Sequence, residues 1–269
     1  MTAPRFFITQ TIPEGPWTSV GRMDVTRNEE QSIAVPLSEA DLHHATTVAR
    51  IRPGEEITVV DGERAVWRLQ VTKVSREALS ARVVGRSESQ GGPHITLVQG
   101  VAKGSKMDRV VEQSVEIGVE RIIPLLAERS VVRLDAAKAT DRADRWRRIA
   151  GAAAKQSRAA WIPRVDDPAE LESLLGVLTE YDVVLVPWED AGIEQDVRTA
   201  LVRAGARVDS RVAVVVGPEG GLSATEVLTL AEAGGVTCSL GSTILRTETA
   251  AIVALALVTD ALRALDDAR

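Results

Sequence analysis

The chain has 269 residues, of which 45% are hydrophobic and 26% charged, and its formal net charge is −6 at pH 7. These values are ordinary for a globular protein, and the longest strongly apolar stretch, Ala250 to Val258, is far too short to cross a bilayer. A single cysteine, Cys238, excludes an internal disulfide and suits a reducing compartment. The opening residues MTAPRFFITQ lack an export signal pattern, so we expect a cytoplasmic protein.

The negative charge is distributed unevenly along the chain. Residues 100–164 hold 14 Lys and Arg against 8 Asp and Glu, whereas residues 165–269 hold 7 against 18. Residues 1–99 are nearly neutral, with 11 against 12. Because local charge governs contact with phosphates, the basic middle segment predicts RNA contact. The alternative is a solvated helix surface on which acidic residues pair with the arginines.

The first 86 residues predict a small β domain with one helix. Alternating runs at Glu56–Val60, Ala65–Val74 and Ala78–Val84 are separated by turn signals, which is typical of a β-barrel or sandwich. Ser38 is the expected cap of a helix that extends to Val48. Residues 87–93, SESQGGP, are polar and glycine-rich, and they predict a linker to a second domain at 94–269.

Strands and helices alternate in the second domain, which predicts an α/β fold with a mainly parallel sheet. Strands are expected at His94–Gln99, Arg121–Leu126 and Val183–Val186, with helices at Lys106–Gly118 and Ala139–Arg158. The apolar face of the first helix is expected to comprise Met107, Val110, Val111, Ser114 and Val115.

Two glycine-containing loops in the last third follow apolar strands. Val212 to Val216 predicts a buried strand, after which the chain reads GPEGG. Ser223 and Glu226 have capping-box spacing, so a helix is expected to begin at Ser223. A second apolar run, in which we expect Cys238 to be buried rather than reactive, leads into GSTILRTETAA and another helix. Such loops form ligand sites at the carboxyl ends of strands, although two ordinary turns would give the same pattern.

The residues present argue against several kinds of site. Three histidines and one cysteine offer no plausible transition-metal ligand set, so we expect no metal. GVAKGSK at residues 100–106 differs from a phosphate-binding Walker A loop in its glycine spacing and in the order of its lysine and hydroxyl. The nucleophile elbow GxSxG is absent from the sequence. Nucleotide hydrolysis is therefore not expected.

Four stretches together resemble one enzyme family. They are RFF at 5–7, GVAKGSKMDRVVEQSVEIGVERIIPLLAERSVV at 100–132, GPEGGLSATEV at 217–227 and LGSTILRTETAA at 240–251. In this order and spacing they are similar to SPOUT methyltransferases of the RsmE type, over nearly the whole chain. The resemblance implies an S-adenosylmethionine-dependent enzyme that methylates N3 of a uridine in 16S ribosomal RNA. It also implies an N-terminal PUA-like β-barrel, a trefoil knot in the C-terminal α/β domain, and a homodimer.

The resemblance implies that three loops bind the methyl donor, which needs close backbone hydrogen bonds and an apolar slot for its adenine. The expected donor-binding residues are Val186, Pro187, Trp188, Gly217, Gly220, Gly221, Leu240, Gly241, Ser242, Ile244 and Leu245. Trp188 is expected either to cover the ligand or to pack at the end of its strand.

Methylation of uracil N3 requires removal of a proton and stabilisation of the anion that remains. Arg246 is the expected cation, because it lies between the donor loop and the start of a helix. Glu219 or Glu248 is expected to accept the proton. Glu248 has a second interpretation, since an acidic residue in the first turn of a helix stabilises that helix.

A set of basic and polar residues is expected to face the RNA: Arg5, Arg50, Arg52, Lys103, Lys106, Arg129, Arg133, Gln156 and Arg158. Phosphate contacts would position the substrate while the uracil enters the site. The chain departs from the family pattern around Gln156, where it reads KQSRAAWIP. This departure weakens the transfer of individual RNA contacts to that loop.

Two other functions remain open from the sequence: a SPOUT ribose 2′-O-methyltransferase, and a non-catalytic RNA-binding or ribosome-assembly protein. The partner expected besides 16S ribosomal RNA is a second copy of the chain. The last helix, at Thr249–Leu265, is the expected interface, through a face of small and apolar residues. The alternative is that this face packs inside its own domain. The face consists of Ala250, Ala254, Leu257, Ala261 and Leu265.

Overall fold

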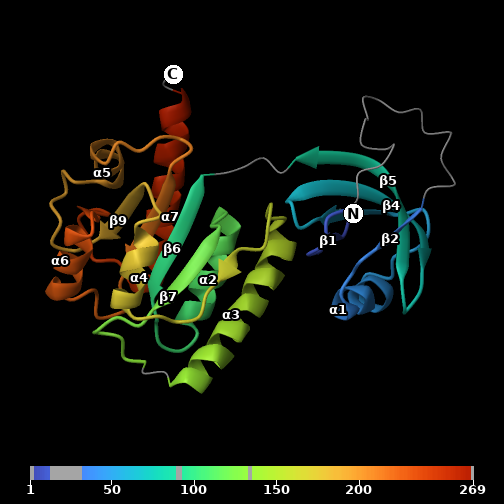
Figure 1. The fold of residues 1–269 in the computed structure, drawn as a ribbon, viewed down its shortest axis with the longest axis horizontal. Coiled ribbons are helices and arrows are strands. Elements are labelled where there is room, and N and C mark those ends of the chain that lie inside the picture. The colour runs from blue at the N-terminus through green and yellow to red at the C-terminus, as the bar shows by residue number, and fades with distance from the viewer. Residues whose placement is uncertain (1–2, 13–31, 89–92, 133–134, 268–269) are drawn as a thin grey trace. The chain divides into compact units, whose positions relative to one another are not determined.

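The computed structural model describes residues 3–12, 32–88, 93–132 and 135–267 (Figure 1). Within it the chain divides into two compact units, residues 1–91 and residues 92–269. Among the described residues, no helix is both long enough and apolar enough to span a membrane.

The first unit contains a five-stranded sheet of order β1-β3-β4-β5-β2. β1 and β3 are parallel, and the other pairs are antiparallel. The predicted β3 and β4 have the bounds expected from their alternating pattern. The elements are β1 (Arg5–Phe7), β2 (Ile33–Val35), α1 (Glu39–His43), a π-helical turn (His44–Val48), β3 (Glu56–Val60), β4 (Ala65–Val74) and β5 (Leu79–Glu88).

A buried carboxylate organises the β3–β4 hairpin of this unit. Asp61 accepts hydrogen bonds from Trp67 Nε1 at 2.7 Å and from the backbone N–H of Ala65 at 2.9 Å and of Glu63 at 3.0 Å. Trp67 is 1% exposed and belongs to the unit's core. Because these three hydrogen bonds replace contacts with water, the Asp61 carboxylate can be buried at the hairpin turn without a large desolvation cost.

Two details of the first unit differ from the sequence prediction. The helix expected at residues 38–48 is capped by Ser38 as predicted, but it continues as a π-helical turn after His43. β5 extends to Glu88, so residues 87 and 88 belong to a strand and not to the predicted linker.

The second unit contains a six-stranded, entirely parallel sheet of order β11-β9-β10-β6-β7-β8 (Figure 1). Its strands are β6 (His94–Gly100), β7 (Arg121–Leu125), β8 (Arg164–Val165), β9 (Val183–Pro187), β10 (Arg211–Val216) and β11 (Val236–Cys238). Its helices are α2 (Lys106–Ile117), α3 (Ala136–Ser157), α4 (Leu171–Leu178), α5 (Val197–Arg203), α6 (Ala224–Glu232) and α7 (Thr247–Asp267).

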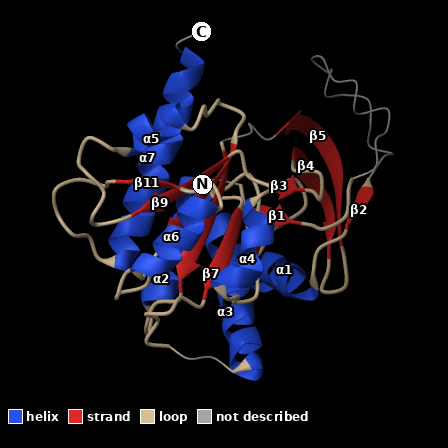
Figure 2. Cartoon of the chain, turned by 60° about the vertical axis from the view of Figure 1, so that its left-hand side comes forward, coloured by secondary structure: helices blue, strands red, loops and turns tan. Residues whose placement is uncertain are grey.

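Helices cover both faces of this sheet (Figures 1 and 2). On one face α4 and α6 pack with alternate side chains of β7, β9 and β10 in a single apolar cluster. α7 packs on β6 and β10 and also contacts α2 and α5. The five residues expected on the apolar face of α2 are all buried, as predicted. The middle strands are apolar on both sides because both sides are covered.

The long helix α7 packs mainly inside its own unit. Ala254 and Ala261, which were expected at a dimer interface, are 0% and 6% exposed in the single chain. This part of the predicted interface is wrong, because the small side chains allow α7 to approach its own sheet and helices closely. Leu257, at the edge of the same face, is 41% exposed.

Candidate active site

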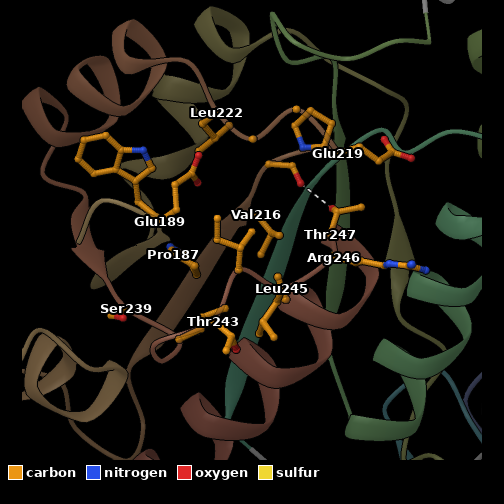
Figure 3. A pocket seen from close by; sticks show the side chains of 18 of the residues that line it. Pro187, Glu189, Val216, Glu219, Leu222, Ser239, Thr243, Leu245, Arg246 and Thr247 are labelled. Carbon is orange, nitrogen blue, oxygen red and sulfur yellow. Dashed lines mark hydrogen bonds between the residues drawn. The ribbon is translucent and has the colours of Figure 1, made fainter. Parts of the chain in front are cut away.

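Three loops meet at the carboxyl edge of the parallel sheet. They follow β9, β10 and β11, which are neighbours in the sheet order, so their carboxyl ends lie side by side. Together with the start of α7 they enclose a cavity of about 400 Å³ (Figure 3). Cavities of this size accept a small organic ligand.

Ten of the eleven residues expected to bind the donor line this cavity. The exception is Val186, which is 1% exposed and packs in the apolar cluster beneath the loops. Its assignment followed from its place at the end of the β9 run, but its side chain points to the core face. Trp188 lines the cavity and also packs against that cluster, as expected for an aromatic at the end of its strand, and its role in covering a ligand stays a prediction. Further lining residues are Glu189, Pro218 and Thr243 within the three expected loops, and Val216, Leu222, Ser239, Thr247 and Ala250 outside them.

The end of β6 and the loop after β10 approach each other too closely for side chains. A Cβ placed on Gly100 would lie 2.3 Å from the backbone N of Pro218, and one on Gly217 would lie 2.7 Å from the backbone of Gly221 and Leu222. Both positions therefore require glycine for steric reasons. The contact leaves the backbone of the 217–221 loop exposed to the cavity, as a ligand held by backbone hydrogen bonds requires.

Charged side chains gather at one side of the cavity. Figure 3 shows Arg246 and Glu219 extending in the same direction from the loops that carry them. Lys106, at the start of α2, lines the same cavity, and its Nζ lies 3.0 Å from Glu219 Oε1 and 3.9 Å from Glu248 Oε2. The structure thus brings together the three residues expected to be catalytic and one of those expected to contact RNA.

Glu219 is held as an ionised group. Burial raises its pKa, but hydrogen bonds from Lys106 Nζ and from the Lys103 backbone N–H, together with the charge on Lys106, outweigh that effect and leave the pKa below its usual value. A carboxylate with a lowered pKa is a weaker base. Glu219 is therefore better suited to fixing Lys106 than to accepting a proton.

Glu248 has a different environment. Its Oε2 atom is buried and has no hydrogen-bond partner among the described residues, since Lys106 Nζ at 3.9 Å is too distant. It lies in the first turn of α7, two residues after Arg246. A buried carboxylate oxygen with unused acceptor capacity is a suitable group to receive a proton from a bound substrate.

Arg246 lies at the positive end of the α7 dipole. Its carbonyl accepts the first hydrogen bonds of the helix, from the N–H groups of Thr249 and Ala250, and its side chain is exposed. A guanidinium at this position, with the N-terminal field of a 21-residue helix behind it, favours a developing negative charge nearby.

A fourth loop, after β7, contacts the loop that follows β10. Arg129 donates from Nη1 to the Gly220 carbonyl at 3.2 Å, and the Glu128 N–H donates to Glu226 Oε1 at 2.9 Å. Glu226 also closes the predicted capping box with Ser223. One carboxylate therefore connects the start of α6 with the loop that carries Arg129.

The residues expected to face RNA fall into separate groups. Lys103, Lys106 and Arg129 lie around the cavity, as described above. Exposed Gln156 and Arg158 lie at the end of α3, where Arg158 has a left-handed conformation. Arg50 and Arg52 are exposed in the first unit, and Arg5 is half-buried there, with its guanidinium 5.7 Å from the Phe7 ring centre. Arg133 lies outside the described residues.

Cys238 is buried in β11, and burial raises the pKa of its thiol to about 12. Such a thiol is neutral and unreactive at physiological pH, in agreement with the core position expected from the sequence. Among the residues that the structure describes, no cluster of three or more His, Cys, Asp or Glu could hold a metal ion.

Comparison with known proteins agrees with the geometry of this site. Residues 90–259 match the family model of an RNA methyltransferase domain, and residues 37–84 match that of an RNA methyltransferase PUA domain. The ribosomal RNA small subunit methyltransferase E of Bacillus subtilis is 31% identical over 240 residues, which cover 88% of this chain and 94% of that protein. The enzyme of the same name from Mycobacterium bovis is 38% identical over 220 residues, covering 80% and 82%.

Solved structures show the same relationship. The small subunit methyltransferase E of Neisseria gonorrhoeae, solved bound to S-adenosyl methionine, has a TM-score of 0.75 and 27% identity, and the match covers 96% of this chain and 98% of that one. The similarity extends over both units, and the cavity, its glycine-rich loops and its charged side lie within the matched methyltransferase domain. The chain therefore belongs to the RNA methyltransferase family that includes the ribosomal RNA small subunit methyltransferases E.

Proposed function

We propose that this protein transfers a methyl group from S-adenosylmethionine to N3 of a uridine in the 16S RNA of the small ribosomal subunit. The observation that carries the proposal is the cavity at the ends of β9, β10 and β11, which Arg246, Lys106 and Glu219 line at one side, with Glu248 3.9 Å from Lys106. The near-full-length similarity to small subunit methyltransferases E gives the substrate class. Because the proposed substrate is ribosomal RNA, we expect the protein to act in the cytoplasm.

The residues present fit the proposed donor. The loop backbone at Gly217, kept bare by the contact with Gly100, offers close hydrogen bonds, and Leu222, Leu240 and Leu245 offer apolar walls for an adenine. When bound, S-adenosylmethionine supplies an electrophilic methyl group. We assign donor binding to the loops at 187–189, 217–222 and 239–245.

The chain's own side chains supply the remaining chemistry. Glu248 accepts the N3 proton of the uracil, because its Oε2 atom has free acceptor capacity. Arg246 stabilises the uracil anion that forms, and the α7 N-terminus adds a field of the same sign. Glu219 holds Lys106 at the side of the cavity, where the lysine positions the substrate. Holding the methyl donor and the uracil close together in a fixed orientation contributes further rate enhancement.

Nucleoside analysis tests this function directly. Small-subunit RNA from a strain that lacks the protein is expected to lose N3-methyluridine, and purified protein with S-adenosylmethionine is expected to restore it in vitro. Mass spectrometry of digested RNA distinguishes N3-methyluridine from 2′-O-methyluridine through the mass of the released base. Appearance of a 2′-O-methylated nucleoside instead would support the ribose methyltransferase, and absence of any methylation would support a binding protein.

We also propose that the protein is a homodimer. Ile244, which lines the cavity, is 88% exposed and Leu257 on α7 is 41% exposed, so apolar surface remains uncovered on both elements. We expect light scattering at micromolar concentration to give twice the chain mass of 28.8 kDa. Ile244→Asp and Leu257→Asp should shift the mass toward that of one chain, whereas Leu228→Asp, at an exposed position of α6, serves as the matched control. A wild-type mass near 28.8 kDa would contradict the dimer.

The trefoil knot stays a prediction of the resemblance.

A further inference from the structure

Gln99 is a polar residue enclosed in the core of the second unit. It is the penultimate residue of β6 and is 0% exposed. Its Nε2 atom donates to the Gly100 carbonyl at 2.9 Å, to Thr247 Oγ1 at 2.9 Å and to the Gly217 carbonyl at 3.3 Å. Burying an amide is costly unless its polar atoms are used, so these contacts call for an explanation.

Thr247 completes a closed network with Gln99. The Thr247 hydroxyl accepts from Gln99 and donates to the Gly217 carbonyl at 2.6 Å, a bond drawn in Figure 3. The network connects β6, the loop after β10 and the first residue of α7. Two of its members, Gly217 and Thr247, line the cavity, and Arg246 immediately precedes Thr247.

We propose that Gln99 is a positioning residue for the donor cavity, which it does not itself line. Its amide fixes the Gly217 peptide and the start of α7 relative to one another before the donor arrives. The inference rests on the proposed function, because it concerns the same cavity. A loop that is ordered before the ligand arrives does not lose conformational entropy on binding, and the affinity is therefore higher.

The acceptors around Gln99 determine which way its amide points. Two carbonyl oxygens and a hydroxyl oxygen surround Nε2, whereas Oε1 has no hydrogen-bond partner among the described residues. Rotating the amide by half a turn would place Oε1 against two carbonyl oxygens, which is repulsive. The network therefore requires a donor at this position, and a carboxylate of the same shape would not serve.

The first test removes the donor group while keeping the size of the side chain. In Gln99→Met, the Gly217 carbonyl loses one of its two donors, and we expect S-adenosylmethionine to bind about tenfold more weakly by calorimetry. Thr96→Val is the matched control: Thr96 is a buried polar residue on the same strand, and it accepts a hydrogen bond from the Tyr181 hydroxyl, away from the loop. We expect this control to alter thermal stability but not donor affinity.

A second test examines the other half of the network and applies even if Gln99→Met fails to fold. Thr247→Val should weaken donor binding, and Thr247→Ser, which keeps the hydroxyl, should recover most of that loss. In Gln99→Glu, only the protonated carboxyl can donate a hydrogen bond. As the pH is lowered from about 8 to about 6, the donor dissociation constant of this variant, divided by that of the wild type, should therefore decrease. A purely structural role would not give this pH dependence.

The outcomes separate this inference from the proposed function. Wild-type donor affinity in Gln99→Met and Thr247→Val, with only a lower melting temperature, would overturn the positioning role and leave the proposed function intact. Failure of the wild-type protein to bind S-adenosylmethionine would overturn both. The network would be supported by three results together. Both variants bind the donor more weakly, the double variant loses less affinity than the sum of the two single losses, and Thr96→Val keeps wild-type affinity.

Discussion

Arg246→Ala is expected to reduce methyl transfer by about 100- to 1,000-fold with little effect on folding. The guanidinium is exposed at the N-terminus of α7, where it can meet the negative charge that develops on the uracil. Removing one group aimed at developing charge typically costs this much in turnover. Single-turnover rates on small ribosomal subunits, with donor in excess, measure the effect on the chemical step.

Two variants control for charge and for helix stability. Arg263→Ala removes an exposed arginine near the other end of the same helix and should leave the rate unchanged. Arg246→Lys should recover little, because one ammonium cannot reproduce the planar donor fork of the guanidinium. If Arg246→Ala keeps a near-wild-type single-turnover rate but needs more RNA to saturate, the residue contacts phosphate and does not stabilise the anion.

Glu248→Gln is expected to lower the rate by about 100- to 10,000-fold, the usual contribution of a general base. The amide keeps the shape of the side chain but cannot accept the N3 proton. Donor affinity should change little, so the loss should appear in the single-turnover rate at saturating donor.

Glu219→Gln is the matched comparison, since both glutamates lie near Lys106. We expect a smaller loss of rate, because Glu219 acts by holding Lys106. Its carboxylate stabilises the fold above its unfolded pKa, and this contribution is lost as the pH falls through its lowered folded value. The variant should therefore be destabilised most near neutral pH and least in acid. A larger loss of rate in Glu219→Gln than in Glu248→Gln would reverse the assignment of the two roles.

Local patterns in the sequence were sufficient to predict many of the elements. β3 and β4 have their predicted bounds, the apolar face of α2 is buried as expected, and the Ser223 capping box is present. Each of these features depends on residues a few positions apart, where periodicity and capping preferences operate. The three loops that line the cavity could also be located, because each follows an apolar strand.

What could not be predicted depends on contacts between distant residues. Gln99 reads as one polar residue at the end of a strand, and nothing near it indicates a bond to Gly217, which is 118 positions away. Likewise, the bond between the Lys103 N–H and Glu219 spans 116 positions, so the sequence alone left both glutamates as candidate bases. Strand order decides these contacts, and hydrophobic periodicity carries no information about strand order.

The pairing of β6 with β10 also bears on how the protein is made. β6 is the first strand of its sheet to be synthesised, yet its neighbour on one side is β10, and both the cavity and Gln99 need the start of α7 as well. Translation proceeds at about 5–20 residues per second, so β6 waits several seconds with one edge and an apolar face uncovered. Sheets built from such distant pairings fold slowly. Newly made chains should therefore depend on chaperones at this stage, and truncation before α7 should yield an aggregating fragment.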